Sequence, residues 1–478
     1  MLSAEMNDRI ARVGPGTPCG ELMRRYWIPF LPTAKFDDDP VQKVRLLGED
    51  LTAYRDTTGN FGLIGERCLH RAVDMQWGIP DTDGLRCPYH GWLYGADGSC
   101  LDTPLEAQES TFKERLRIVA YPVQELGGLV FAYMGPLPAP VLPRWDLYVW
   151  PNAVRQIGTV MLNCNWLQCH ENTGDPLHGV WLHGHLFKYA LEKMGAPPER
   201  METELRAGIN AFIKNGVGVQ GLYANPTKYG MEKGVIYSKA LGADRDYRSR
   251  HSTVVFPFYT QVGVAGSPRS EFQIRVPIDD THTYHMTYTC YAAPPGLEAP
   301  HQDSVPWYAV PIYDEAGKPI LDSITNGDMI AWWSQGPLTD RSKEKLGRTD
   351  VPVIFLRRQL NEQISLVEAG KDPMNVFRDP AQMPDILHGS GEPPIDWTAP
   401  DWVERHSASY RQTSPDWETR QAAPGRTSSN AAFRMHAEGA LRDTDRYGPA
   451  IPLIAELHRR IEEAQLAATA VREPDGAG

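Results

Sequence analysis

The sequence has no excess of basic residues and no long hydrophobic run. Its 478 residues include 48 Lys and Arg against 60 Asp and Glu, a formal net charge of -12. Nucleic-acid-binding proteins carry a basic footprint, so this balance argues against that class. No stretch approaches the roughly 20 apolar residues of a membrane span, and the first residues lack the basic region and apolar core of a secretory signal. We therefore expect no binding to nucleic acid or to a membrane.

Cysteine is also scarce. Seven cysteines in a chain of this length are too few and too irregularly spaced for a disulfide framework, so a reducing, cytoplasmic location is expected. In such a location, cysteines that cluster with histidines indicate a metal site. The apolar fraction of 41% and the charged fraction of 23% are typical of a globular protein, and the length allows two or three domains.

The residue pattern changes near residue 150. Before it, short β-like runs alternate with turns, and Asp83-Gly84 and Asp97-Gly98 predict tight hairpins. After it, longer helical stretches appear, and the chain ends in an expected amphipathic helix and a disordered tail over 472–478. Strands are predicted at 41–47, 52–54, 61–64, 118–121, 129–133, 252–258, 272–276 and 283–291, and helices at 164–190, 322–335 and 352–369.

Two Cys-His pairs form the first chemical motif. Cys68 and His70 are followed, after sixteen residues, by Cys87 and His90, giving C-x-H and C-x-x-H. Two thiolates and two imidazoles can bind tetrahedral zinc, or a [2Fe–2S] cluster with both His on one iron and both Cys on the other. A zinc finger places its Cys pair and its His pair in separate blocks. The alternating order therefore favours the cluster over a zinc site.

This pattern, within residues 42–136, resembles the Rieske domain. The resemblance implies a small all-β domain in which Cys68 and Cys87 hold the buried iron and His70 and His90 hold the outer iron. The alternatives are a Cys2His2 zinc site or four unligated core residues.

The second motif is D-x-x-H-x4-H, formed by Asp175, His178 and His183 and preceded by N-W-x-Q-x-x-E-N. Histidines five residues apart do not share a face of a regular α-helix, so a local irregularity near Pro176 and Gly179 is expected. Two His and one carboxylate on one side of a metal make the facial triad of non-heme Fe(II) oxygenases. In isolation, such a pair is more often two solvated surface histidines.

Together the motifs resemble the Rieske non-heme iron oxygenases, in particular the phthalate-dioxygenase-like branch of single-component α subunits. The resemblance implies that His178 and His183 bind Fe(II). It also implies that Asp175 is no ligand but bridges His178 to His90 of a neighbouring subunit, so that electrons pass from the cluster to the iron.

The third iron ligand must come from farther along the chain. The segment N-G-D-M-I-A-W-W-S-Q-G-P resembles the family's ligand helix and makes Asp328 the candidate, with Asp322 as runner-up. Without the two histidines, Asp328 would be interpreted as an acidic residue near a helix N-terminus. Many relatives have Gln or Glu where this chain has Gly327, which softens the helix locally. The resemblance implies that His170 and His185 are not metal ligands, and His185 is expected to be structural or pocket-lining.

The resemblance further implies an α+β fold with four parts. They are an N-terminal lead-in (1–41) that packs on the catalytic domain, an all-β Rieske domain (42–140), a helix-grip catalytic domain of antiparallel sheet and helices (141–380), and a C-terminal extension (381–478).

The implied function is that of a terminal oxygenase. It uses O2 and electrons from an NAD(P)H-dependent reductase, directly or through a ferredoxin, to cis-dihydroxylate or monooxygenate an aromatic, carboxylated substrate; O- or N-demethylation is an alternative. A head-to-tail homotrimer or stacked hexamer places one subunit's cluster beside the next subunit's iron. The competing classes are a Rieske electron carrier without oxygenase activity and a zinc-stabilised binding protein. A substrate carboxylate would call for a basic residue in the pocket. The candidates are Arg206, Lys214, Lys239 and Arg245, although each is more often a solvated surface charge.

Overall fold

The computed structural model describes residues 2–107, 110–205, 209–237, 247–263, 269–293, 296–321, 323–389 and 448–470. The tail expected at 472–478 and the alternative ligand Asp322 lie outside the described residues. Within them, no helix is both long and apolar enough to cross a membrane.

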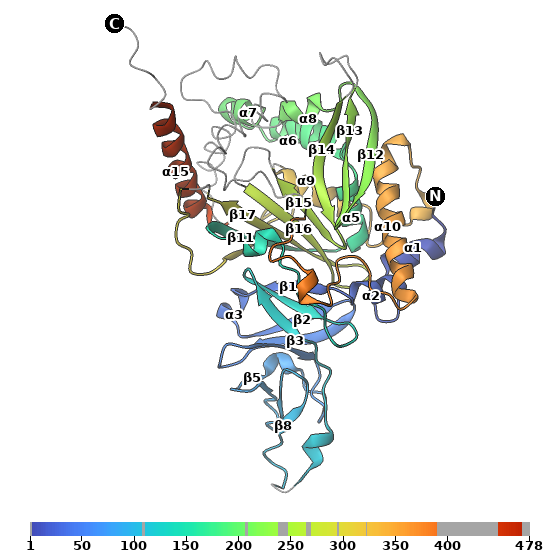
Figure 1. The fold of residues 1–478 in the computed structure, drawn as a ribbon, viewed down its shortest axis with the longest axis vertical. Coiled ribbons are helices and arrows are strands. Elements are labelled where there is room, and N and C mark those ends of the chain that lie inside the picture. Colours follow the sequence, from blue (N-terminus) through green and yellow to red (C-terminus); the bar gives the residue numbers. More distant parts are fainter. Residues whose placement is uncertain are drawn as a thin grey trace.

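Three small antiparallel sheets build the tapered end of the molecule (Figure 1). The sheets are β1 (Trp27–Pro32), β10 (Leu129–Tyr133) and β9 (Val123–Leu126); β2 (Val41–Leu46), β3 (Glu49–Arg55) and β4 (Phe61–Gly65); and β5 (Ile79–Pro80), β6 (Leu85–Arg86), β7 (Leu93–Tyr94) and β8 (Cys100–Asp102). The predicted hairpins at residues 83–84 and 97–98 join β5 to β6 and β7 to β8. The run predicted as a strand at 118–121 makes only isolated bridges.

Gly98 shows why the second hairpin needs glycine. Its φ is +83°, and a Cβ there would lie 2.2 Å from the carbonyl oxygen of Ile118. Both the left-handed backbone and the close approach exclude a side chain. The Asp-Gly turn thus brings the β7–β8 loop against the segment before β9.

An eight-stranded sheet forms the centre of the larger part. It is antiparallel except where its edge strand β18 pairs with β11. In spatial order its strands are β12 (Val219–Thr227), β13 (Gly230–Tyr237), β14 (Tyr247–Val255), β15 (Tyr259–Gly263), β16 (Arg269–Pro277), β17 (Thr283–Ala292), β11 (Ala153–Leu162) and β18 (Trp307–Ala309).

The two faces of this sheet differ. On β16, Phe272, Ile274 and Val276 lie in the main apolar core, which also contains Phe30 of β1 and Phe131 of β10. This core joins the sheet to the tapered end. The residues that alternate with them are polar and point to the opposite face, because successive side chains of a strand alternate.

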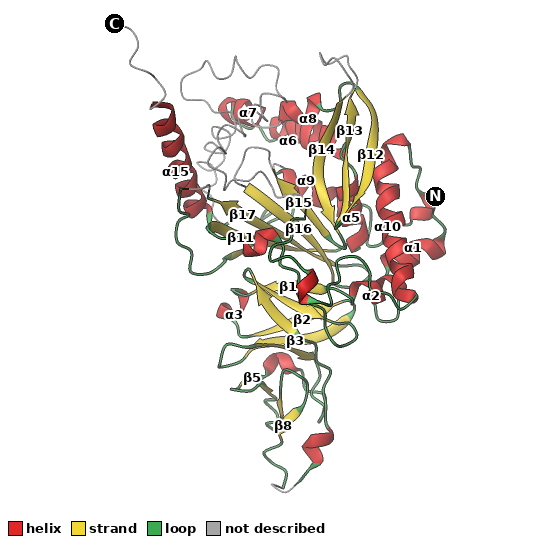
Figure 2. Cartoon of the chain, in the orientation of Figure 1, coloured by secondary structure: helices red, strands yellow, loops and turns green. Residues whose placement is uncertain are grey.

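Helices gather around the large sheet, while strands dominate the tapered end (Figure 2). Helix α5 packs on β16 and α10 packs on β12. The described helices of four or more residues are α1 (Ala4–Ala11), α2 (Pro18–Met23), α3 (Lys35–Asp38), η2 (Phe112–Arg115), α4 (Asp146–Val149), α5 (Trp166–Glu171), η4 (Val180–Leu186), α6 (Phe187–Lys193), α7 (Pro198–Glu204), α8 (Asn210–Lys214), α9 (Ile324–Trp333), α10 (Val351–Glu368) and α15 (Ile451–Ala470).

The chain termini are tied to the large part. Arg9 of α1 pairs with Glu368 of α10 at 2.6 Å, and Ile454 and Leu457 of α15 are buried with Val154 of β11. The amphipathic terminal helix predicted from the sequence is therefore present and packs on the sheet. The fold is α+β, as expected.

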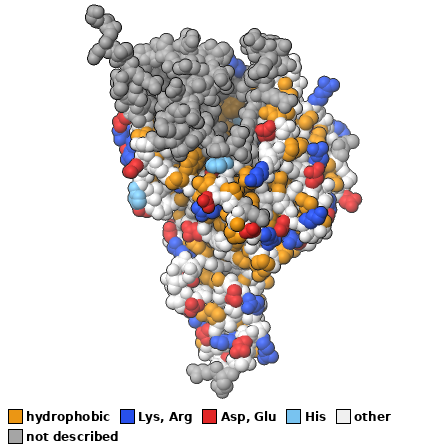
Figure 3. Space-filling view, in the orientation of Figure 1, with side chains coloured by type: hydrophobic (Ala, Val, Ile, Leu, Met, Phe, Trp, Pro, Cys, Tyr) orange, Lys and Arg blue, Asp and Glu red, His pale blue; other side chains and the backbone are white. Residues whose placement is uncertain are grey.

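On the face shown in Figure 3, acidic and basic side chains are interspersed over the tapered end. On that face, the described part of the tapered end therefore shows no broad patch of one charge sign.

Candidate metal centres

The segment that carries both site histidines is not a regular α-helix. After α5, a short 3-10 turn leads to Asp175, whose Oδ1 accepts hydrogen bonds from the backbone N–H of Leu177 (2.8 Å) and His178 (3.2 Å). The carboxylate thus caps the helical turn that begins at His178. From Val180 to Leu186 the helix is a π-helix, whose i→i+5 hydrogen bonding suits histidines five residues apart. The irregularity expected near Pro176 and Gly179 is therefore this π-turn.

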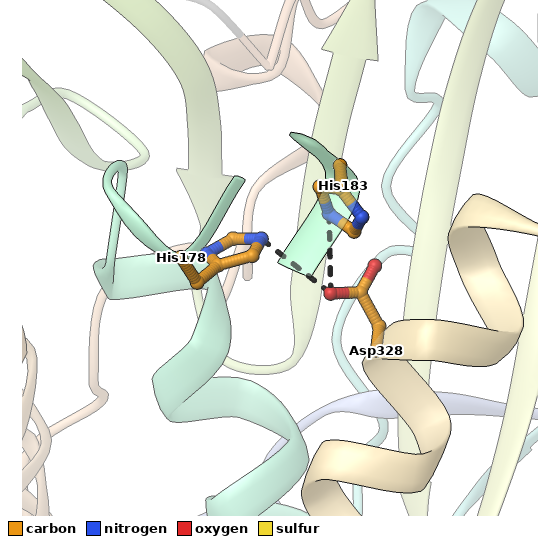
Figure 4. Close-up of side chains that lie close together, drawn as sticks. All are labelled: His178, His183 and Asp328. Atoms are coloured by element: carbon orange, nitrogen blue, oxygen red, sulfur yellow. Dashed lines mark ion pairs between the residues drawn. The ribbon is translucent and has the colours of Figure 1, made fainter. Parts of the chain in front are cut away.

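Asp328 of α9 faces these histidines across the interior (Figure 4). Its Oδ1 lies 3.4 Å from Nε2 of His178 and 3.3 Å from Nε2 of His183. One ligand atom from each of the three residues lies within 4.8 Å of the others. The two imidazole rings are nearly perpendicular, at 81°. The three candidates named from the sequence therefore meet, and their donor set is the two-His, one-carboxylate set that suits Fe(II).

Two neighbouring groups orient this triad. The Nδ1 of His178 hydrogen-bonds to the backbone carbonyl of Asp175, which places the proton on Nδ1 and leaves Nε2 as the lone-pair nitrogen. Asn172 donates from Nδ2 to Oδ1 of Asp328 at 3.2 Å. Asn172 was not identified from the sequence; it belongs to the E-N pair of the motif, and nothing in its spacing indicates that it meets a distant helix.

Burial controls the protonation of the triad. It lowers the pKa of His178, against the opposing field of Asp328. Burial also acts to raise the pKa of Asp328, but the hydrogen bond to His183 and the nearby imidazoles outweigh it and hold the pKa below its ordinary value. Neutral imidazole and ionised carboxylate are the forms that bind a metal.

The four residues of the first motif lie on the loops that follow β4 and β6, where Cys68 neighbours Cys87 and His70 neighbours His90. Cys68 and Cys87 are only 3% and 2% exposed, whereas His70 is exposed and His90 is half-buried. The two imidazole rings lie 4.4 Å apart, and His70 stacks on Trp92 at 4.6 Å. Thiols inside and imidazoles outside fit the donor set of a Rieske cluster.

Tyr94 was missed in the sequence and supports this loop. Its hydroxyl lies 3.3 Å from Sγ of Cys68 and accepts a hydrogen bond from the backbone N–H of Leu69. Hydrogen bonds to ligand sulfurs tune the potential of iron–sulfur clusters.

The remaining described candidates are not among the three residues whose ligand atoms group together. His170 is buried, and His185 is exposed, with its ring 4.4 Å from that of Trp181 in a tilted arrangement. Of the basic residues considered for a substrate carboxylate, Lys214 is exposed. The others lie outside the described residues: Arg206, Lys239 and Arg245.

Comparison with known proteins agrees with this donor chemistry. Residues 26–122 match the family model described as the Rieske [2Fe-2S] domain. The chain is 38% identical over 385 residues, 80% of its length, to the 5,5'-dehydrodivanillate O-demethylase oxygenase subunit of Sphingobium sp. (strain NBRC 103272 / SYK-6), covering 85% of that relative. It is 29% identical to the phthalate 4,5-dioxygenase oxygenase subunit of Pseudomonas putida, covering 78% of this chain and 88% of the relative.

Among solved structures, NdmA of Pseudomonas putida CBB5 has a similar fold, with a TM-score of 0.52 and 18% identity over 75% of this chain and 94% of that chain. The Rieske domain implies a [2Fe–2S] cluster, and the related oxygenases use non-heme Fe(II) and O2. The chain belongs to the Rieske non-heme iron oxygenases and is a terminal oxygenase subunit of the group that includes the phthalate and dehydrodivanillate enzymes.

Proposed function

We propose that the buried triad is the oxygenation site and that the Cys-His loops are its electron source. The observation that carries this proposal is the triad itself: three buried or half-buried donors from two helices, with ligand atoms within 4.8 Å. The assigned residues are His178, His183 and Asp328 for Fe(II), and Cys68, His70, Cys87 and His90 for the [2Fe–2S] cluster.

The chain's contribution is ligand geometry. When bound, the iron supplies coordination positions for O2 and the oxidising chemistry, and the cluster supplies single electrons. The carbonyl of Asp175 holds the proton of His178 on Nδ1, so Nε2 stays free to coordinate. Asn172 holds Oδ1 of Asp328, which restrains rotation of the carboxylate. Burial around Asp328 limits entry of bulk water.

We propose that electrons cross between subunits, from the partner subunit's His90 through Asp175 to His178, in a homotrimer or a stacked hexamer. Exposed apolar side chains at both ends of this route support a subunit contact. Tyr89, beside the cluster loops, is 53% exposed, and Trp181, on the π-helix, is 70% exposed. The electrons come from an NAD(P)H-dependent reductase, directly or through a ferredoxin.

The proposed substrate is aromatic and carboxylated, and the proposed reaction is hydroxylation. O-demethylation is the second candidate, favoured by the 38% identity to an oxygenase subunit named for 5,5'-dehydrodivanillate O-demethylation. A cytoplasmic location is proposed as well, because none of the seven cysteines forms a disulfide, which suits a reducing compartment.

Replacement of Asp328 tests the metal assignment. We expect Asp328→Asn to lower the iron content from about three to about two per chain, to keep the electron paramagnetic resonance (EPR) signal of the reduced cluster, and to abolish NAD(P)H-dependent substrate oxidation. Asp340→Asn is the matched control, because Asp340 lies on the surface and pairs with Lys343. Retention of the third iron in Asp328→Asn, or absence of a Rieske signal in the wild type, contradicts the proposal.

A further inference from the structure

The polar face of the central sheet lies inside the protein. Arg275 of β16 is directly opposite His285 of β17, and the next pair on the same face is Gln273 and Thr287. Arg275 is 0% exposed and His285 is 1% exposed. A sheet face in contact with water is ordinarily polar, but here the polar residues are withdrawn from water. Buried polar groups are costly unless they find partners.

Arg275 is a buried cation that forms no salt bridge with a carboxylate among the described residues, although the charges of Asp328 and Glu271 act on it from a longer distance. Its Nη1 donates to Oγ1 of Thr260 (2.7 Å) and to the carbonyl of Gln273 (3.0 Å), and its Nη2 donates to Oε1 of Gln273 (2.6 Å). Its Nε has no partner in the described part of the chain. The nearest acidic residue along the strand, Glu271, is paired with Arg269.

Two further unpartnered groups lie beside it. Both ring nitrogens of His285 and Nε1 of Trp332 are buried and have no hydrogen-bond partner among the described residues. The guanidinium of Arg275 lies 5.4 Å from the Trp332 ring, and the His285 ring also lies 5.4 Å from it. Arg275, His285 and Trp332, each with an unsatisfied N–H group, are therefore close neighbours in the interior.

Trp332 shows how near Arg275 and His285 are to the iron triad. It follows Asp328 by four residues on α9, a rise of about 6 Å along the helix axis. This separation is comparable with the length of a substituted benzene ring. A group held by Arg275 and His285 can therefore present the opposite end of an aromatic ring toward the side of the triad.

We propose that Arg275 and His285 bind the carboxylate of the aromatic substrate, with Trp332 beside it. This inference rests on the proposed function, since it places the substrate relative to the triad. A carboxylate accepts from Nε–H of Arg275 and from one imidazole N–H, and it supplies a hydrogen-bonded counter-charge, whereas the described acceptors of the guanidinium are all neutral. Burial lowers the pKa of Arg275 only to about 10, so it stays a cation at neutral pH.

The test compares acids with their amides. Calorimetric titration of the anaerobic, iron-loaded holoenzyme uses two probe pairs: 3-methoxybenzoate with 3-methoxybenzamide, and 5,5'-dehydrodivanillate with its diamide. We expect the wild type to bind at least one acid about 10- to 100-fold more tightly than its amide. Arg275→Met and His285→Gln lose most of this preference, and Arg275→Lys keeps part of it because it keeps the charge.

Arg358→Met is the control, because Arg358 is 65% exposed on α10 and its loss leaves the preference unchanged. Iron content and the cluster EPR signal of each sample report the proposed function separately from substrate binding. The inference is overturned if the wild type prefers neither acid, or if Arg275→Lys and His285→Gln keep the full preference. In that case the unpartnered groups serve a structural role, such as holding internal water.

Discussion

Two single atoms that orient the triad come from residues outside it. The carbonyl of Asp175 fixes the tautomer of His178, and the amide of Asn172 holds the carboxylate of Asp328. Such supporting groups change metal affinity by about 10- to 100-fold in known metal sites. The geometry of the triad therefore depends on a backbone carbonyl that no substitution at Asp175 itself removes.

Asn172→Ala tests this support. Removal of the Nδ2 donor frees the carboxylate of Asp328, so we expect iron to dissociate about 10- to 100-fold more readily while the cluster stays intact. Chelator competition followed by iron analysis measures the change. Asn225→Ala is the control, since Asn225 donates to Glu232 on the hairpin of β12 and β13. Unchanged iron retention in Asn172→Ala would show that the carboxylate is held by the metal alone.

Lys233 gives a pH dependence. It is buried and donates to the carbonyl of Thr173 and to Ser252, and burial lowers its pKa to about 7. The unfolded chain, with an ordinary lysine pKa near 10.4, binds this proton more readily. The contribution of Lys233 to the free energy of unfolding therefore rises as pH increases from about 7 toward 10, by at most about 1.4 kcal/mol per pH unit.

We expect Lys233→Met to lose this slope. Melting temperatures at pH 7, 8 and 9 compare it with the wild type and with Lys343→Met, whose side chain is 84% exposed. The wild type should gain stability relative to Lys233→Met as pH rises, whereas Lys343→Met should follow the wild type. Parallel curves for all three proteins would contradict a lowered pKa for Lys233.

The triad was named because the segments around His178 and around Asp328 resemble the family's motifs. Asn172, Arg275 and His285 were not named, because their neighbours Asp328 and Trp332 come from a distant helix. Alternation along β16 predicts a polar face, but only the three-dimensional packing shows that this face is buried.

At the level of elements, the π-turn of η4 sets the position of His183. On a regular α-helix, side chains five residues apart are rotated by about 140° about the helix axis. The wider π-turn reduces this rotation, so the imidazoles of both His178 and His183 reach Oδ1 of Asp328.

A buried ion network joins three elements around the site. Glu171, at the end of α5, accepts hydrogen bonds from Nε and Nη2 of Arg341, each at 2.8 Å. Glu171 also forms an ion pair with Arg357 of α10. Burial raises the pKa of Glu171, but the two arginines outweigh it and hold the pKa below its ordinary value. This network holds α5 in position, and with it the start of the segment that leads to His178 and His183.

Glu171→Gln should therefore destabilise the fold. It leaves Arg341, which is 0% exposed, without its carboxylate, at a cost of about 3–5 kcal/mol. Thermal unfolding measures the loss, and Glu362→Gln is the control because Glu362 is 61% exposed. A melting temperature equal to that of the control would show that the network contributes nothing net.

Most elements follow from periodicity, and their failures have physical causes. The predicted helix at 164–190 is broken into α5, a 3-10 turn, the π-helix and α6, because the capping by Asp175 and the π-turn obey local hydrogen bonding rather than hydrophobic spacing. The run at 118–121 has strand-like residues but makes only isolated bridges. The domain boundaries at 41, 140 and 380 stay predictions, and β1, from the lead-in, pairs with β10.

For the whole molecule, the question is whether electrons cross between chains. The cluster loops lie at the tapered end and α9 lies beyond the central sheet (Figure 1). We expect mixed oligomers of Cys87→Ser, which lacks the cluster, and Asp328→Asn, which lacks the iron, to oxidise substrate although neither variant alone does. Subunits are mixed by co-expression under two affinity tags. Inactive mixed oligomers would contradict transfer between subunits.

The two-faced sheet also separates two kinds of evolutionary constraint. Its apolar face is shared with the tapered end, so substitutions there disturb folding of both parts. The opposite face, where Arg275 and His285 are paired, contributes only to smaller apolar clusters: Val160, opposite His285, lies in one with Trp332, and Val154 lies in another with α15. If that face holds the substrate, as proposed, a lineage can exchange its few polar residues, and with them the molecules it accepts, without disturbing the core that both parts share.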